Sequence, residues 1–178
     1  ISSKIFGKLY EKKKSWNSLS FNRYIAQLRK KFPEKFSYFY NTLQSNINLK
    51  KIASNKKVIN NIKNILSIDE SNVSHSISHM RIDSFIDQRN SYDWHQERSY
   101  YPMNEDGNGI VVWIALSKIS NSIGPLHALK GSHKEGFINP STIKKKNHST
   151  QHKIPKQIID KYKSNLKVFN LNPGDAIF

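Results

Sequence analysis

His95 and Glu97 are the residues of this sequence whose types and spacing could support metal chemistry. They stand two apart in the segment DWHQERSYY, residues 93–101, between aromatic side chains. In an extended chain, alternate side chains lie on one face, about 7 Å apart along the strand. An imidazole and a carboxylate that lean together can hold one ion, and a distant second His would complete the facial triad that binds Fe(II). The spacing alone is weak evidence, because a surface His beside a carboxylate is common.

The composition of the chain limits which side chains could bind a metal ion. The chain of 178 residues has no cysteine, which excludes disulfides, thiolate zinc sites and cysteine nucleophiles. Any metal must therefore be held by His and carboxylate side chains. His148 and His152 lie four apart but without the Glu of an HExxH site. We interpret His133, His127 and His79 as structural histidines, although the last two could line a pocket.

The formal net charge of +16 could attract nucleic acid, an acidic membrane surface or an anionic small molecule. The lysines are scattered in short runs, however, and Asn, Ile, Lys and Ser are abundant together, which is typical of a biased genome composition. We therefore predict no specific nucleic-acid partner. No run approaches the roughly 18 apolar residues of a membrane span, and we expect a cytoplasmic protein. Its oligomeric state cannot be predicted from the sequence.

The N-terminal third carries helical periodicity. Over residues 15–45 apolar side chains recur at helical spacing, and Pro33 divides the segment into two helices. A second amphipathic stretch covers residues 55–69 and places Val58, Ile62, Ile65 and Leu66 on one face. We expect these stripes to face a core rather than a membrane.

From about residue 73 the pattern becomes extended. Residues 73–85 alternate, and residues 109–119 are apolar on both faces, as in a strand buried between two layers. Turn signals flank a short strand near residues 124–136, and the basic stretch 139–153 is interpreted as a loop. One or two helical turns near 154–165 precede a strand, an Asn-Pro-Gly-Asp turn and a strand. The pattern predicts a mainly β fold with N-terminal helices, in which a helical part, 1–70, packs on a β-barrel core, 73–178, within a single domain, 1–178.

Several segments in order resemble one known family. They are WHQE at 94–97, a tyrosine pair, VVWIALSKI, GPLHALKGSHKEG and NPGDAIF. This series is similar to that of the phytanoyl-CoA dioxygenase family of Fe(II)/2-oxoglutarate-dependent oxygenases, over roughly residues 75–178. The resemblance implies a double-stranded β-helix core, also called a jelly roll or cupin-like fold. The sequence starts at Ile1 and stops inside an expected strand, so we expect a fragment whose core is incomplete at the C-terminus.

The resemblance also assigns roles to individual residues. His95 would be the first iron ligand and Glu97 the carboxylate ligand, where Asp is commoner in the family. Trp113 would border the 2-oxoglutarate pocket. Gln96 matches a cosubstrate-site residue, although a regular strand would turn it away from His95 and Glu97. The second iron-binding His and the Arg that pairs with 2-oxoglutarate are expected beyond Phe178.

The function implied is that of a dioxygenase that uses Fe(II), 2-oxoglutarate and dioxygen to hydroxylate an unactivated C–H bond. Its substrate would be a small molecule, for which anionic or acyl compounds are candidates. Tyr100, Tyr101 and Arg98 follow the metal pair and could contact this substrate, or could pack at a strand edge. The alternative is a non-catalytic jelly-roll binding module with the same fold.

Overall fold

The computed structural model describes residues 19–83, 91–101, 109–144 and 150–178, with residues 19–22 represented by their helical backbone. The chain divides into two compact units, Ile1–Ile86 and Asp87–Phe178. The extended residues 73–83 therefore belong to the same unit as the N-terminal helices, and the His95–Glu97 segment belongs to the second. The prediction of a single domain over 1–178 stays a prediction.

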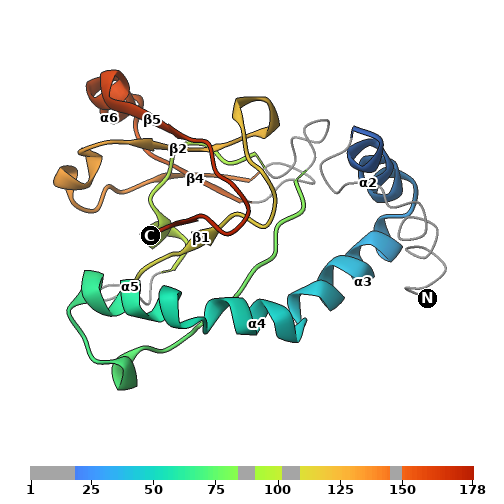
Figure 1. Cartoon of the computed structure of the whole chain (residues 1–178). Coiled ribbons are helices and arrows are strands. Elements are labelled where there is room, and N and C mark those ends of the chain that lie inside the picture. Colours follow the sequence, from blue (N-terminus) through green and yellow to red (C-terminus); the bar gives the residue numbers. More distant parts are fainter. Residues whose placement is uncertain (1–18, 84–90, 102–108, 145–149) are drawn as a thin grey trace. The chain divides into compact units, whose positions relative to one another are not determined.

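The first unit is built from helices that follow one another along the chain (Figure 1). They are α2 (Leu19–Lys31), α3 (Pro33–Gln44), α4 (Ile47–Ala53) and α5 (Lys56–Leu66), followed by the short 3₁₀ helix η1 (Glu70–Asn72). The predicted division at Pro33 is confirmed, because this proline occupies the first turn of α3, where its missing N–H costs nothing. Helix α4 was not predicted. Asn46 and Asn55 start α4 and α5, each accepting a backbone N–H two residues on at 2.9 Å.

The core of this unit lies between α2 and α3. Ile25, Leu28 and Phe36 are buried, and Ile82 packs against them from the extended segment. The predicted core-facing stripe is thus confirmed for α2. The stripe of α5 is only partly covered, because Ile65 keeps 53% of its surface exposed.

Residues 73–83 do not form the predicted alternating strand, and residues 84 and 85 lie outside the described part of the chain. Burial alternates only at the end of the segment, where Ser78, Met80 and Ile82 are half-buried between exposed neighbours, but the backbone does not pair with any described strand. A side chain replaces the missing strand partner at one point. The amide of Gln44 accepts the Met80 N–H at 2.7 Å and donates to the Met80 carbonyl at 3.0 Å.

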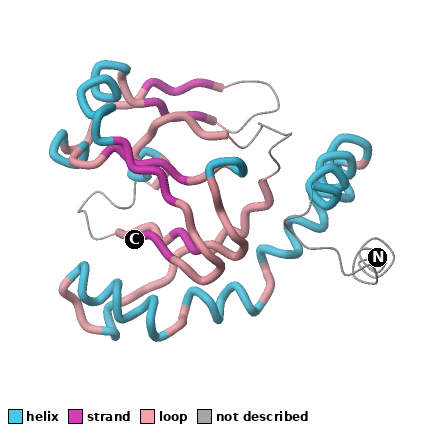
Figure 2. Tube along the Cα trace, turned by 45° about the horizontal axis from the view of Figure 1, so that its top comes forward, coloured by secondary structure: helices cyan, strands magenta, loops and turns pink. Residues whose placement is uncertain are grey.

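In the second unit the strands form three antiparallel pairs that are nested along the chain; Figures 1 and 2 show the strands in space. The outermost pair is β1 (Trp113–Ile114) with β6 (Ala176–Ile177), and the middle pair is β2 (Leu126–Leu129) with β5 (Leu166–Phe169). The innermost pair is β3 (Ser141–Ile143) with β4 (Gln151–Lys153). The segments between strands carry η3 (Glu97–Ser99), η5 (Asn121–Ile123), η6 (Ser132–Glu135), α6 (Lys156–Tyr162) and η7 (Lys163–Asn165).

The predicted strand 109–119 is shorter and less buried than expected. Only Trp113 and Ile114 form a strand, and Val111 and Leu116 are 41% and 52% exposed. The chain nevertheless continues along its partner, because Ile119 bridges Leu171 in the register that β1 and β6 share. Bends on both sides interrupt the ladder, so the side chains cannot all be enclosed between two layers.

The predicted Asn-Pro-Gly-Asp turn is confirmed. The Asp175 N–H donates to the Asn172 carbonyl at 3.0 Å, and Gly174 has a φ of 94°, as the third position of a type II turn requires. The two flanking strands pair with β2 and β1 rather than with each other.

Two further predictions need correction. The basic stretch 139–153 contains the strands β3 and β4, which pair antiparallel, while residues 145–149 lie outside the described part of the chain. The predicted helical turns near 154–165 are confirmed as α6 and η7. The fold is also less β-rich than predicted, because helices occupy more of the described residues than strands do. The strands are short because each pairs with a single neighbour over only two to four residues.

Candidate metal centre

The side chains of His95 and Glu97 converge. The His95 Nε2 and Glu97 Oε1 atoms lie 3.4 Å apart. The path of the backbone differs from the expected regular strand. Gln96 is extended, with φ −106° and ψ 136°, but Glu97 begins the 3₁₀ turn η3. The turn carries the Glu97 carboxylate toward the imidazole, which a straight strand would not do.

A backbone carbonyl fixes the His95 ring. The Nδ1 atom lies 2.6 Å from the Asp93 oxygen, and a carbonyl oxygen can only accept, so Nδ1 carries the hydrogen. In a neutral ring Nε2 then presents its lone pair. This lone pair faces a carboxylate oxygen, which is also an acceptor. Two acceptors directed at each other favour a cation between them, either a proton on the ring or a metal ion.

The spacing of this pair suits adjacent positions around one metal ion. Two atoms that each bond one ion at about 2.0–2.2 Å can lie at most about 4.4 Å apart, so a separation of 3.4 Å would let both groups bind the same ion. Glu97 is about half exposed and His95 less so, which leaves the carboxylate accessible from solvent. Within the described ranges, no group of three His, Cys, Asp or Glu side chains could hold a metal ion. The described residues therefore offer two ligands.

Strand β4 holds the segment that precedes His95. The buried Gln151 accepts the Asp93 N–H at 3.0 Å and donates to the Ser91 carbonyl at 3.4 Å. The Lys153 ammonium lies 2.5 Å from the Asp93 carboxylate, and the Ile154 N–H donates to the Trp94 carbonyl at 3.0 Å. The residue whose carbonyl orients His95 is thus held through both its backbone and its side chain.

Aromatic rings surround the imidazole. The Tyr100 ring meets His95 edge-on with centroids 5.2 Å apart, and meets His152 of β4 at 4.6 Å. Tyr92 packs on both, 5.7 Å from His95 and 5.8 Å from Tyr100. The Tyr100 hydroxyl accepts the His152 N–H at 3.0 Å and donates to the Thr150 carbonyl at 3.4 Å. Burial raises the pKa of the Tyr100 phenol, which keeps it neutral at physiological pH.

The Gln96 side chain extends to the loop after η6. Its Nε2 donates to the Gly136 carbonyl at 2.7 Å, and its Oε1 accepts the Ile138 N–H at 2.9 Å. Both polar atoms of the amide are therefore engaged with backbone forty residues away. The cosubstrate role predicted for Gln96 stays a prediction, and it would require at least one of these hydrogen bonds to open.

Comparison with known proteins places the chain in a family. The sequence profile described as phytanoyl-CoA dioxygenase (PhyH) matches residues 26–178. The chain belongs to this family. No curated protein and no solved structure matches it significantly. Membership implies a double-stranded β-helix core, suggests an Fe(II)/2-oxoglutarate oxygenase and implies a small-molecule substrate. None of the described helices is long and apolar enough to cross a membrane.

The other residues predicted from the family resemblance have defined places. Trp113 is half-buried in β1, opposite Ile177. The Arg98 guanidinium lies over the Phe137 ring at 4.8 Å, and Tyr101 donates its N–H to the Glu97 carbonyl at 3.2 Å. Burial, followed by the negative charge of Glu97, raises the pKa of Tyr101. The cosubstrate and substrate roles of these residues stay predictions.

Several residues that build this site could not be predicted from the sequence. Asp93 orients His95 through its backbone carbonyl, a contact any residue type could make, so its position two residues before the histidine was not informative. Gln151 and Tyr92 act through burial and ring packing that depend on β4 lying alongside residues 91–94. Only the alignment of these segments reveals their role.

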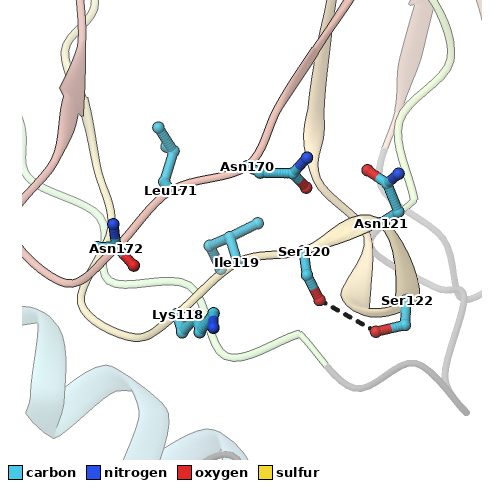
Figure 3. Close-up of a pocket in the computed structure, with 8 residues that line it drawn as sticks. All are labelled: Lys118, Ile119, Ser120, Asn121, Ser122, Asn170, Leu171 and Asn172. Carbon is cyan, nitrogen blue, oxygen red and sulfur yellow. Dashed lines mark hydrogen bonds between the residues drawn. The ribbon is translucent and has the colours of Figure 1, made fainter.

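A separate open hollow of about 510 Å³ lies in the second unit, beside the β-bridge between Ile119 and Leu171 (Figure 3). Its remaining lining is polar: Lys118, Ser120, Asn121, Ser122, Asn170 and Asn172. The Ser120 and Ser122 hydroxyls bond each other at 3.0 Å, as Figure 3 shows. The lining includes no carboxylate or imidazole, so this hollow offers no conventional metal ligands of the kind present at residues 95 and 97.

Proposed function

We propose that this member of the phytanoyl-CoA dioxygenase family is an Fe(II)/2-oxoglutarate-dependent dioxygenase that hydroxylates an unactivated C–H bond of a small molecule. The observation that supports this most directly is the convergence of His95 Nε2 and Glu97 Oε1 at 3.4 Å, with the imidazole tautomer fixed by the Asp93 carbonyl. An imidazole and a carboxylate in this arrangement provide two of the three protein ligands that non-haem Fe(II) oxygenases use.

The chain's own residues would bind and orient the iron. His95 presents Nε2 because its other nitrogen donates to backbone, and Glu97 supplies a negative oxygen that is open to solvent. Iron bound there would supply the oxygen activation that protein side chains cannot perform. The rings of Tyr92 and Tyr100 pack against the imidazole and limit water on that side.

The proposed cosubstrate and substrate contacts follow from position in the chain. Trp113 is the residue proposed to border 2-oxoglutarate, by family resemblance. Tyr100, Tyr101 and Arg98 continue from Glu97 through η3 and its end, and are proposed to meet the substrate. The net charge of +16 suits an anionic or acyl substrate, since a positive field concentrates anions. Two of these groups are less available to a substrate, because the Tyr100 hydroxyl accepts the His152 N–H and the Arg98 guanidinium lies over the Phe137 ring.

Anaerobic Fe(II) titration in the presence of 2-oxoglutarate tests the proposal. The chelate should give a weak visible charge-transfer band with the unmodified chain. His95→Ala should abolish the band, and His133→Ala is the matched control, because His133 is an exposed histidine in η6 of the same unit. A band of unchanged intensity in His95→Ala would remove His95 from the metal site and refute the proposal.

A second measurement separates an oxygenase from a non-catalytic binding module. An oxygenase converts 2-oxoglutarate to succinate when iron and oxygen are present, even slowly without its substrate. A binding module would retain 2-oxoglutarate unchanged. Succinate that forms with the unmodified chain but not with His95→Ala supports catalysis, whereas 2-oxoglutarate that binds the unmodified chain and stays unconverted supports the binding module.

A further inference from the structure

Gln96 stands between the two proposed metal ligands, and both polar atoms of its side chain are hydrogen-bonded to backbone. Its amide forms hydrogen bonds of 2.7 Å to the Gly136 carbonyl and of 2.9 Å from the Ile138 N–H. We propose that Gln96 is a positioning residue, which fixes the spacing of His95 and Glu97 rather than contacting 2-oxoglutarate. This inference rests on the proposed function, because it concerns the metal site assigned there.

The two hydrogen bonds determine the orientation of the backbone around Gln96. A donor and an acceptor on one planar amide, each bonded to a different backbone group, leave the side chain one orientation. Gln96 adopts extended dihedrals, and the chain turns into η3 immediately after it. Holding residue 96 in this way fixes where the chain turns, and the turn brings the Glu97 carboxylate toward the imidazole.

The loop that receives Gln96 is itself attached to α6. The Glu135 carboxylate accepts hydrogen bonds from the Lys161 ammonium at 2.6 Å and from the Tyr162 hydroxyl at 2.5 Å. A Cβ placed on Gly131, just before η6, would lie 3.6 Å from the Tyr162 ring, so the chain that enters η6 also lies close to this tyrosine. The Gly136 and Ile138 groups that bind Gln96 therefore belong to an anchored loop.

A second glutamine fixes the other side of His95. Gln151 binds the backbone of Ser91 and Asp93, and the Asp93 carbonyl binds His95 Nδ1. His95 lies between a backbone held by Gln151 and a backbone held at Gln96. This arrangement limits the freedom of the imidazole without involving any group that would coordinate the ion. Outer residues of this kind typically change metal affinity 10–100-fold when they are replaced.

The chemistry of the anchor requires an amide. The Gly136 carbonyl needs a donor and the Ile138 N–H needs an acceptor, and glutamine offers both at the correct length. Glutamate of the same length keeps the acceptor and loses the donor. Methionine keeps the length and loses both. The series Gln, Glu, Met therefore offers two, one and no hydrogen bonds from this side chain.

Titration of the full chain with Co²⁺ tests this inference, followed by visible absorption, since the bands of Co²⁺ report the geometry of its ligands. We expect Gln96→Met to weaken Co²⁺ binding about 10–100-fold and to alter the band shape. Gln157→Met is the matched control, because Gln157 is exposed on α6 in the same unit, and should leave affinity and spectrum unchanged. Hydrogen exchange should also accelerate at the Ile138 N–H in Gln96→Met, at temperatures where the chain stays folded.

Each other outcome gives a defined answer. If Gln96→Met binds Co²⁺ with unchanged affinity and spectrum, the positioning role is wrong, and weaker binding of 2-oxoglutarate by this variant would make Gln96 a cosubstrate ligand. If His95→Ala binds Co²⁺ as the unmodified chain does, or the unmodified chain binds none, the proposed function fails and this inference fails with it.

If Gln96→Met does not fold, Gln96→Glu decides. Its added negative charge by itself favours a cation, so weaker Co²⁺ binding supports positioning, while equal or tighter binding refutes it.

Discussion

Replacing Gln151 by methionine should destabilise the second unit and loosen the proposed metal site. The side chain is buried, with 7% of its surface exposed, and methionine of similar length fills the same space without opening a cavity. The main loss is the 3.0 Å hydrogen bond from the Asp93 N–H, because the contact with the Ser91 carbonyl is long at 3.4 Å. A backbone N–H left without a partner costs about 1–3 kcal/mol. Because burial of methionine offsets part of this, we expect a net loss of about 1–2 kcal/mol.

Urea unfolding followed by tryptophan fluorescence measures this loss. Trp94 and Trp113 both lie in the second unit, and Trp94 adjoins the segment that Gln151 holds. With a denaturant slope of about 2 kcal/mol per molar urea, the middle of the usual range of about 1–3, the midpoint should fall by roughly 0.5–1 M. Gln157→Met serves again as the control on the exposed face of α6. A midpoint for Gln151→Met equal to that of the control would refute the reasoning, since the buried amide would then contribute nothing to holding residues 91–93.

Two predictions concern pH. Burial raises the pKa of Tyr100, so the neutral phenol stabilises the folded state below the usual pKa of 10.0, and this contribution should be lost as pH rises above it. The difference in urea midpoint between Tyr100→Phe and the unmodified chain should therefore shrink between pH 9 and pH 11, and a constant difference would count against it. The bond from Lys161 lowers the pKa of Glu135, so its stabilisation should be present above the usual 4.5 and decline as pH falls through the lowered pKa. Glu135→Gln should accordingly lose less stability than the unmodified chain on acidification from pH 6 to pH 3, which the same titration at each pH would show.

Helices α2, α3, α5 and α6 could be predicted because their determinants are local, whereas α4 was missed. Apolar spacing in α2 and the proline at the start of α3 act within a few residues, and tertiary packing reinforces both. The positions of several strands could be predicted but their lengths could not, because the length of a strand depends on a partner elsewhere in the chain. Residues 73–83 have the alternation of a strand, but no strand among the described residues forms a ladder with them.

The convergence of His95 and Glu97 was expected from their spacing, but the sequence did not reveal how it is achieved. A 3₁₀ turn beginning at Glu97, not a regular strand, brings the two groups together. The anchoring of Gln96 was also unpredictable, because its partners are backbone groups of Gly136 and Ile138 and carry no side-chain signal. Local patterns thus identified the candidate ligands, whereas the residues that support them depend on contacts 40–60 positions apart.

The nesting of the strand pairs has a consequence for how the chain folds. Ile143 and Gln151 are eight positions apart, while Trp113 and Ile177 are 64 apart. Each doubling of the length of a closed loop adds about 0.6 kcal/mol to the entropic cost of closing it. The outermost pairing therefore costs roughly 1.8 kcal/mol more to close than the innermost, if no other pair has formed before it. Closing from the inside outward avoids much of this difference, because each inner pair shortens the loop that remains. We therefore expect β3 and β4 to pair first during folding. Gln151, which lies in β4, would then be held in its strand before β1 and β6 pair.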